Sequence, residues 1–518
     1  MNTAIPLPML YDQLALPAML DHIAVCLRRA KVNVYRMEDR LVYVFRWEIP
    51  SSDAEDGLHR DANALVTETM TDLRLLEYII EHARFNKLDR RSGNLVIFAP
   101  PPKLASHFMA SKDRWSFRVL NGVIQAPTMR ADGSLLTKEG YDRLSGLYLD
   151  TGGVEFPTIS HNPSKDEAEC ALALLKTPFE EFPFPANDDD FPPLSPSLSV
   201  ALSAVLTGLI RRTLPTAPLH GFDAAEAGSG KGLACSIVTT IVTGNRATAI
   251  NYSTTETEFR KLLFSALLAN DQVIVLDNVT RPLEGDALNS CLTESRIGDR
   301  ILGLSENATV PTNALLLANG NNLAVKGDMH RRIIAARIEA GENPEQRRFK
   351  RPNLLGWVEE HRASLVAAGL TILRAYEVAG RPGATELPEF GSFEQWSARV
   401  RGALVWLGQA DPCVTRERFK LYDTDRANLG AFLSALQELI GQPWFRVADL
   451  VRQLQEITHD HPLHISIEGA GLALDARSIG NYLAKNEGKT VDGLRLDGGH
   501  DKHKKVRMFR VINTQAQP

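Results

Sequence analysis

The chain has 518 residues, of which 44% are hydrophobic and 23% charged, and its formal net charge is −5 at pH 7. This composition is typical of a globular protein, and the length exceeds a single ordinary core, so we expect about two to four domains. The acidic balance excludes a uniformly basic nucleic-acid coat protein, and any contact with DNA must be confined to a channel or a small patch.

The sequence carries no sign of a membrane or secretory segment. No apolar run approaches the length of a bilayer span, and the first residues, MNTAIPLPMLYDQ, lack the basic-then-apolar design of a signal peptide. The five cysteines are scattered and form no C-x-x-C pair, which indicates a reduced compartment and no zinc site. We therefore expect a cytoplasmic protein without a membrane partner.

Residues 1–190 are predicted to form an α+β domain, and no motif in the first 70 residues indicates its role. Val32 to Trp47 is rich in β-forming residues on both sides of a Glu38-Asp39 turn and predicts a hairpin. Residues 70–88 have helical spacing. The apolar side of this helix is expected to comprise Leu73, Leu76, Ile79, Ile80 and Ala83.

The stretch from Gly122 to Asp150 carries the turn signals Asp132-Gly133 and Ser145-Gly146 and predicts short strands around them. A dense acidic cluster, Asp188-Asp189-Asp190, follows in a segment rich in Pro and Phe. A two-metal polymerase centre needs carboxylates that hold metals about 3.5–4 Å apart, but a cluster in these surroundings is typical of a solvated linker. We place a domain boundary near residues 185–197 and expect no primase centre before it.

A phosphate-binding loop is predicted within residues 191–340, after an apolar helix at 197–214. Residues 219–240, LHGFDAAEAGSGKGLACSIVTT, give an apolar strand, a loop of small residues and an apolar helix. The first amides of a helix lack partners and its dipole is positive there, so such a loop converges on a phosphate. The predicted nucleotide-binding residues are Glu226, Ala227, Gly228, Ser229, Gly230, Lys231 and Gly232.

Two positions depart from the phosphate-loop pattern G-x-x-x-x-G-K-[ST]. Ala225 replaces the first glycine, which is a mild change. Gly232 replaces the hydroxyl residue that normally ligates Mg²⁺. Lys231 is kept and is expected to reach the β- and γ-phosphates of ATP. The loop therefore predicts ATP binding, with hydrolysis weakened by the missing hydroxyl.

A second nucleotide signature follows a predicted helix at 256–269. Residues 273–276 are apolar and run into Asp277, and a buried parallel strand delivers such a residue to the edge of the sheet where ligands bind. We assign Asp277 to Mg²⁺, held through water, with a helix N-cap aspartate as the alternative. Asn278 stands where many ATPases have a glutamate, so it can orient a water molecule but cannot take its proton.

Residues 300–317 predict a hairpin that turns at Ser305-Glu306-Asn307 and continues as an apolar strand. The strand ends in ANGNN, and Asn321 is expected to sense the γ-phosphate or to hold the attacking water. The alternative is a turn that is rich in asparagine for conformational reasons. Glu306 and Glu226 are alternative catalytic acids, although both fit ordinary surface glutamates better.

A pair of arginines, Arg331 and Arg332, follows the predicted sensor strand and precedes the apolar stretch IIAARIE. This position suits an arginine finger that reaches the γ-phosphate of a neighbouring subunit. The alternative is a surface ion pair with Asp328. A finger that acts on a neighbour requires assembly into a ring.

The segments 225–232, 273–278, 314–322 and 327–332 together resemble the AAA+/superfamily III helicase-like ATPases of phages, prophages and integrative elements. Within that group the chain is similar to a family of phage or prophage ATP-binding proteins and DNA primase/helicases. The phrases that carry the resemblance are GVIQAPTMRADGSLLTKEGYDRLSGLY, LPTAPLHGFDAAEAGSGKG, VIVLDNVTRPL, RILGLSE, ANGNN, GDMHRRI and GSFEQWSARVRGALVWLG.

The resemblance covers roughly residues 75–410 and implies a P-loop AAA+-like α/β core, a parallel sheet with flanking helices, that uses ATP and Mg²⁺. Its superfamily III relatives work as hexamers that thread one DNA strand through a central pore. A homo-oligomeric ring, DNA and a separate primase or replication protein are therefore the implied partners. Gly232 is a departure from the family pattern, whereas the Asp277-Asn278 pair is normal for it.

Residues 341–440 are mostly helical in pattern and are expected to form a lid or collar. Three tryptophans, Trp357, Trp396 and Trp406, stand at helical spacings with Leu and Val. Core packing explains them better than stacking on nucleic-acid bases.

Residues 441–518 have the element order of a winged helix, which is a helix-turn-helix with a β-wing. The wing is expected at the loop from Asp497 to Lys505, and its charges suit contacts with DNA phosphates, which bind independently of sequence and weaken with salt. The predicted DNA-binding residues are Lys502, Lys504, Lys505 and Arg507. His500 and His503 fit solvent-facing positions better than ligand positions.

The main functional hypothesis is an ATP-dependent DNA translocase or helicase that acts in the replication of a phage or mobile genetic element. The alternative is a hydrolysis-impaired, ATP-binding initiator or regulator that binds DNA, with Gly232 in place of the Mg²⁺-ligating Ser or Thr. A third hypothesis, an ATP-dependent defence or signalling switch, requires an effector domain, for which only residues 1–70 remain.

Overall fold

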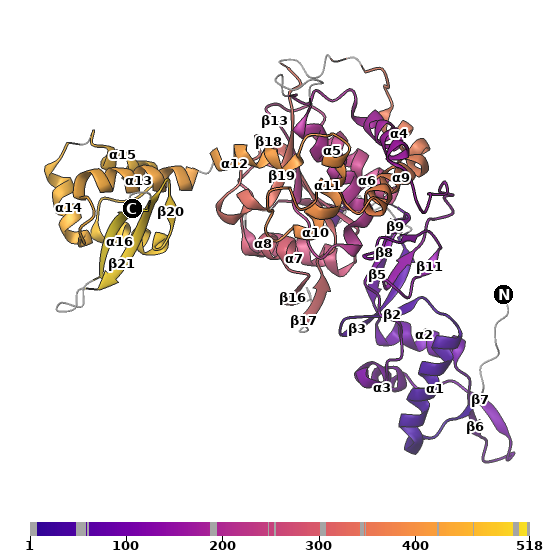
Figure 1. The fold of residues 1–518 in the computed structure, drawn as a ribbon. Coiled ribbons are helices and arrows are strands. Elements are labelled where there is room, and N and C mark those ends of the chain that lie inside the picture. Colours follow the sequence, from indigo (N-terminus) through magenta and orange to yellow (C-terminus); the bar gives the residue numbers. More distant parts are fainter. Residues whose placement is uncertain are drawn as a thin grey trace. The chain divides into compact units, whose positions relative to one another are not determined.

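The computed structural model describes residues 8–47, 58–59, 62–186, 194–246, 248–252, 255–300, 307–341, 347, 349–421, 424–458, 460–500 and 507–514. The chain divides into two compact units (Figure 1). The first unit, which we call the sheet unit, comprises Met1–Leu323 and Arg331–Thr415. The second, the C-terminal unit, comprises Ala324–His330 and Arg416–Pro518.

A six-stranded sheet in the order β19-β13-β18-β15-β14-β4 is the centre of the sheet unit. The strands are β4 (Leu58–His59), β13 (Leu219–Ala224), β14 (Thr248–Asn251), β15 (Val273–Val279), β18 (Leu315–Asn321) and β19 (Ile333–Ile338). All pairings are parallel except that of β4. The parallel strands are mostly buried, as expected for a sheet whose two faces are covered by helices. The predicted mixed α/β fold with a parallel sheet is confirmed.

Helices flank this sheet, and two of them, α5 (Pro196–Ile210) and α6 (Lys231–Thr243), are buried along most of their length. The others are α4 (Lys165–Lys176), α7 (Glu256–Leu268), α8 (Asp286–Thr293), α9 (Leu354–Val378), α10 (Glu394–Trp396) and α11 (Gly402–Trp406). The short helix α12 (Glu417–Leu421) belongs to the C-terminal unit. Ser195 caps α5 by accepting a bond from the amide of Leu198. On the buried side of α5, Trp396 Nε1 donates to Thr207 Oγ1 over 2.8 Å.

The three tryptophans of the predicted collar differ in burial. Trp396 is fully buried, as predicted for a core residue. Trp357 and Trp406 are only half-buried. Trp357 stacks on His361 with ring centroids 4.2 Å apart, because residues four apart lie on the same side of a helix.

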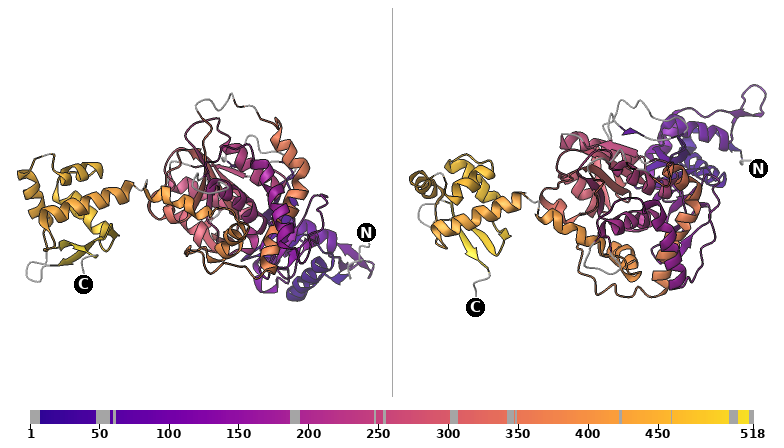
Figure 2. Two further views of the ribbon diagram at one scale, coloured as in Figure 1. Left: turned by 45° about the horizontal axis from the view of Figure 1, so that its top comes forward. Right: turned by 90° about the horizontal axis from the view of Figure 1, so that it is seen from above.

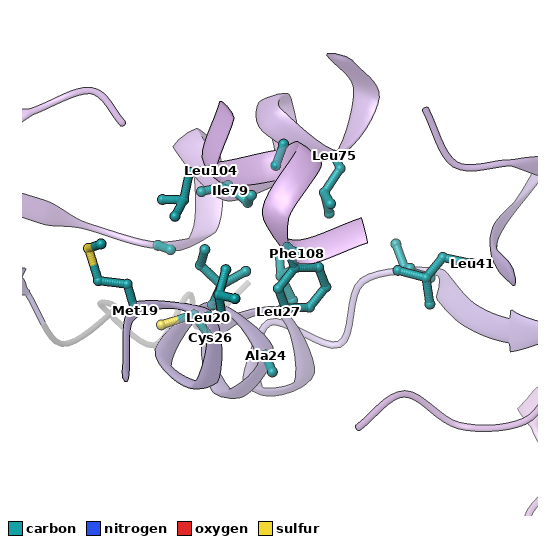
Figure 3. Close-up of a cluster of buried hydrophobic side chains, with 14 of the residues drawn as sticks. Met19, Leu20, Ala24, Cys26, Leu27, Leu41, Leu75, Ile79, Leu104 and Phe108 are labelled. Carbon is teal, nitrogen blue, oxygen red and sulfur yellow. The ribbon is translucent and has the colours of Figure 1, made fainter. Parts of the chain in front are cut away.

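The N-terminal part packs three helices, α1 (Leu16–Arg29), α2 (Asp72–His82) and α3 (Lys103–Ala110), around one apolar cluster (Figure 3). Leu20 and Leu27 of α1 meet Ile79 of α2 in this cluster. The predicted apolar side of α2 is wrong at two positions, because Leu73 is 73% exposed and Ile80 is 53% exposed. Apolar residues occur on more than one side of α2, and the stripe that contacts its neighbours is Leu75 and Ile79.

The predicted hairpins of the N-terminal part are confirmed. β2 (Val34–Met37) pairs antiparallel with β3 (Arg40–Arg46), and Glu38 in the turn has φ 52°. β9 (Thr128–Met129) pairs with β10 (Leu135–Leu136) around the first predicted turn, and β11 (Gly140–Tyr141) pairs with β12 (Leu147–Leu149) around the second. The remaining strands here are β1 (Met9–Leu10), β5 (Leu65–Thr69), β6 (Phe85–Leu88), β7 (Leu95–Phe98) and β8 (Gly122–Ile124).

One strand from the N-terminal part joins the central sheet, whereas the hairpin predicted from residues 300–317 forms a separate two-stranded sheet. β4, from the N-terminal part, is the edge strand beside β14, so the sheet begins well before the predicted boundary at residue 190. The predicted hairpin is formed by β16 (Arg296–Arg300) and β17 (Asn307–Pro311). Its tip, with Glu306, lies outside the described residues, as does the acidic cluster Asp188-Asp189-Asp190.

In the C-terminal unit, helices pack on a three-stranded antiparallel sheet (Figure 2). The elements are α13 (Thr424–Ile440), α14 (Val447–Glu456), α15 (Pro462–Gly469), α16 (Ala476–Asn486), β20 (Thr490–Val491), β21 (Leu494–His500) and β22 (Arg507–Asn513). Phe432 and Leu436 of α13 share one core with Phe509 of β22. The sequence assigned α13 to the collar, but its apolar face packs in this unit. Among the helices in the described part of the chain, none has the length and apolar composition needed to cross a bilayer.

Candidate active site

The phosphate loop connects the end of β13 to the start of α6. Gly228 has φ 75° and Gly230 has φ 96°, which are left-handed conformations that glycine adopts without strain. The carbonyl oxygen of Glu226 accepts two hydrogen bonds, from Ser229 Oγ at 2.5 Å and from Lys231 Nζ at 2.7 Å. The lysine side chain therefore lies against its own loop and is 9% exposed. An arriving phosphate has to displace the Glu226 carbonyl from this ammonium group.

A buried ion pair lies at the same end of β13. Asp223 and Arg337 of β19 are register partners, and Asp223 Oδ2 lies 2.6 Å from Arg337 Nη1. The other carboxylate oxygen accepts a bond from the amide of Leu323 at 2.8 Å. Burial lowers the pKa of Lys231, the charge of Asp223 raises it, and the charge of Arg337 lowers it. The ion pair thus acts electrostatically on the lysine, and the sequence interpretation missed both of its members.

Gly232, the departure from the phosphate-loop pattern, lies in the first turn of α6. A Cβ atom added at this position has no atom within 4 Å. Packing therefore does not require a glycine here, and a threonine side chain fits the space. This makes the role of the missing hydroxyl testable by substitution.

A buried amide joins the strand of the predicted metal ligand to the phosphate-loop helix. Asn319 of β18 is 6% exposed, and its Nδ2 donates to Asp277 Oδ1 at 2.8 Å. Asn319 Oδ1 accepts from the amide of Asn278 at 3.1 Å, and Nδ2 also lies 3.9 Å from the sulfur of Cys235 in α6. The β15–β18 register shifts after Leu276, which places Asp277 and Asn278 on an irregular, exposed strand end.

The structure thus separates the two asparagines at the end of β18. Asn321, the predicted sensor, is exposed and pairs in register with Ala224. Asn319 is the one whose side chain contacts Asp277, and the sequence interpretation passed over it. Its only sequence signal is that it is a polar residue within the apolar run LLLANGN.

The donor set at this edge fits a magnesium ion that binds mainly to phosphate. Mg²⁺ keeps several waters and uses one or two carboxylates together with phosphate oxygens. Asp277 supplies one exposed carboxylate. No group of three or more His, Cys, Asp or Glu residues suited to a metal occurs in the described part of the chain. Such a set matches this binding mode rather than a cage made only of protein ligands.

The two arginines of the predicted finger have different environments. Arg332 Nη1 donates to the carbonyl of Asn289 and to Thr293 Oγ1, both at 2.8 Å, at the end of α8. A cation at the carboxyl end of a helix is electrostatically favourable. Arg331 is exposed and lies just before β19. Arg332 thus makes contacts within its own chain, and Arg331 is the more exposed of the two.

The predicted DNA-binding residues fall largely outside the described part of the chain. Lys502, Lys504 and Lys505 belong to residues 501–506, which the structure does not describe. Arg507 opens β22, where its guanidinium donates to Glu487 Oε2 and lies 5.4 Å from the ring centroid of Phe509. Arg507 is therefore already paired within the C-terminal unit.

No protein-family model and no curated protein matches this chain. Among solved structures, it is similar to the apo A form of the NrS-1 C-terminal region, with 10% identity and a TM-score of 0.38 over 95% of this chain and 98% of that one. It is also similar to a JCV helicase bound to a thiazolopyridine compound, with 10% identity and a TM-score of 0.21 over 50% of this chain and 73% of that one. Similarity at this level identifies no function, so the proposal below is based on the chain's own residues.

Proposed function

We propose that the protein is an ATP-dependent DNA translocase or helicase that acts in the replication of a phage or mobile genetic element. The observation that carries the proposal is the grouping of a glycine-rich loop ending in Lys231 with Asp277 and Asn319 on adjacent strands of one parallel sheet. Ligands of open parallel sheets bind at the carboxyl ends of the strands, which is where all three groups lie.

In this proposal the loop amides and Lys231 bind the phosphates of ATP. Asp277 holds Mg²⁺, and Asn319 fixes the orientation of that carboxylate. Asn278 and Asn321 are placed to contact the attacking water or the γ-phosphate, and Arg331 completes the site of the next subunit. Such a trans-acting arginine requires a homo-oligomeric ring, for which we propose a hexamer in the cytoplasm.

DNA is the proposed macromolecular substrate, single-stranded or forked, with the C-terminal unit as a winged helix that contacts phosphates. A primase or another replication protein is a proposed partner. The metal supplies charge neutralisation for the transferred phosphoryl group. No step in this account uses a hydroxyl at position 232.

ATP turnover with and without single-stranded DNA tests the proposal, with Lys231→Ala and Gly232→Thr as variants. We expect turnover that DNA stimulates and that Lys231→Ala abolishes, because the ammonium group contacts the phosphates in both ground and transition states. If the wild-type chain binds ATP without turnover and Gly232→Thr restores it, the second candidate holds, an ATP-binding DNA initiator or regulator with impaired hydrolysis. The open space around Gly232 is the observation that favours keeping this candidate.

A further inference from the structure

A segment rich in phenylalanine leads from α4 toward α5, and its rings contact one another in series. The ring centroids of Phe179 and Phe182 lie 6.1 Å apart. Those of Phe182 and Phe184 lie 5.6 Å apart with only 13° between the ring planes, which is a stacked pair. Phe179 is buried, whereas Phe182 and Phe184 are half-buried. The sequence suggested a solvated linker here, but these rings are ordered against the protein.

The middle ring of this series lies against the phosphate loop. A Cβ atom at Gly230 would lie 3.3 Å from Cε1 of Phe182. Gly230 directly precedes Lys231 and caps α6, so Phe182 borders the group of amides that is proposed to bind phosphate. A side chain larger than hydrogen at residue 230 would press on this ring.

Hydrogen bonds hold the aromatic segment in place on both sides. The carbonyl of Pro183 accepts from the amide of Glu339 at 2.9 Å, and the carbonyl of Pro185 accepts from Ser195 Oγ at 2.7 Å. The side chain of Glu181 accepts from the amide of Lys350 at 2.6 Å. The rings are therefore positioned before any ligand arrives, which reduces the entropy lost on binding.

We propose that Phe182 and Phe184 form the nucleobase subsite of the nucleotide site. The inference depends on the proposed function, because it assumes that the loop holds the phosphates. A nucleotide bound there must direct its sugar and base away from the loop, and Phe182 is an aromatic surface at the border of that loop. Stacking contacts the face of a base and not its hydrogen-bonding edge, so this subsite takes nucleoside triphosphates with little preference between adenine and guanine.

The test compares binding of Mg²⁺-ATP, Mg²⁺-GTP and inorganic tripolyphosphate to the full chain by titration calorimetry. We expect Phe182→Ala to raise the Kd of both nucleotides by about tenfold to a hundredfold, as for loss of one base–aromatic stack. Tripolyphosphate has no base, so its Kd is expected to stay at the wild-type value. Phe182→Tyr, which keeps the ring, is expected to retain nucleotide affinity.

The matched control is Phe98→Ala, which removes a half-buried ring that contacts Tyr11 in the N-terminal part. A second measurement uses Phe182→Trp, whose tryptophan fluorescence is expected to change on addition of ATP and not on addition of tripolyphosphate. Equal weakening of ATP and tripolyphosphate by Phe182→Ala would overturn the inference, because the ring would then only support the loop. Unchanged affinity for all three ligands would overturn it as well.

Failure of the nucleotide site on which the proposed function depends gives a different result. In that case the wild-type chain binds neither ATP nor tripolyphosphate, and Lys231→Ala changes nothing. Failure of the subsite alone leaves wild-type binding and its dependence on Lys231 intact.

Discussion

Two candidate ligand surfaces differ in how far their polar side chains are buried. One is formed by the carboxyl ends of β13, β15 and β18, and the other is the hairpin β21–β22. At the strand ends, each of two polar contacts includes one buried side chain, Asn319 in the contact with Asp277 and Asp223 in the contact with Arg337. On the hairpin, the charged side chains are largely exposed and pair with nearby carboxylates, as Arg495 does with Asp497. That contact holds the pKa of Asp497 below its usual value.

This difference in burial predicts which changes will affect each surface. A buried hydrogen bond fixes a geometry, and removing one partner leaves the other unsatisfied, so single substitutions have large effects. An exposed ion pair contributes little by itself, and such a surface acts through its summed charge. We therefore expect the strand ends to depend on individual atoms and the hairpin to depend on salt.

The largest effect is expected at the two arginines before β19. Arg331→Ala is expected to lower DNA-stimulated ATP turnover by about 1,000-fold, as for loss of an arginine finger. Arg332→Ala is expected to lower the unfolding midpoint, because it removes the contacts with Asn289 and Thr293 at the end of α8. Steady-state turnover and thermal unfolding of both variants provide the measurement. The assignment is wrong if Arg332 alone controls turnover in an otherwise stable chain.

The ion pair of β13 and β19 tests the role of burial directly. Arg337→Ala leaves the Asp223 carboxylate, whose side chain is 4% exposed, without its guanidinium partner. We expect a loss of about 3 kcal/mol in the free energy of unfolding. The matched change on the hairpin is Arg495→Ala, which breaks an exposed pair and is expected to cost about 1 kcal/mol or less. Denaturant unfolding measures both, and equal losses would remove the distinction drawn between the two surfaces.

The two asparagines of β18 sharpen the assignment of the site. Asn319→Ala is expected to lower ATP turnover by about tenfold to a hundredfold, because it removes the buried donor that orients the Asp277 carboxylate. Asn321→Ala removes an exposed amide and is expected to have a smaller effect. The dependence of turnover on Mg²⁺ concentration should shift only in the Asn319 variant. The opposite ranking would restore Asn321 as the principal sensor.

The burial of His220 in β13, the strand that leads into the phosphate loop, also predicts that the stability of the chain depends on pH. Burial lowers the pKa of His220 from 6.5 to about 3, so the folded chain keeps this ring neutral where the unfolded chain protonates it. Its contribution is fully present above pH 6.5, and stability falls by about 1.4 kcal/mol for each pH unit from there toward pH 3. We expect His220→Gln to flatten the dependence of the unfolding midpoint on pH between 6.5 and 4.5. His500→Gln, on the exposed hairpin, is the control, and an unchanged slope in the His220 variant would contradict the prediction.

The sequence predicted those parts of the structure that depend on local order. The strand, loop and helix around Lys231 follow from adjacent residues, and so do the hairpins at Glu38 and Asp132. The apolar side of α2 could not be chosen correctly, because Leu73 and Leu75 are both apolar and only packing with α1 and α3 decides between them.

The sequence pattern could not predict contacts between distant segments. β18 lies between β13 and β15, and this strand order determines that Asn319 rather than Asn321 meets Asp277. Asp223 and Arg337 are brought together by parallel register across 114 residues. The approach of Phe182 to Gly230 is also a contact between distant segments. The composition of a linker does not reveal which surface the linker crosses.

The smallest expected effect concerns the hairpin β21–β22, where substitutions should change the salt dependence of DNA binding. This tests the second half of the comparison between the two surfaces. Replacing Lys502, Lys504 and Lys505 by Ala is expected to reduce the slope of log Kd against log salt concentration for single-stranded DNA by about 2, since each phosphate contact contributes about 0.7. Arg507→Ala is expected to change the slope by less than one contact, because its charge is already balanced by Glu487. ATP affinity, measured in the same variants, should stay at the wild-type value. A slope that depends on Arg507 and not on the lysines would mean that the ion pair opens on binding, and the hairpin would then resemble the strand ends in depending on one specific contact.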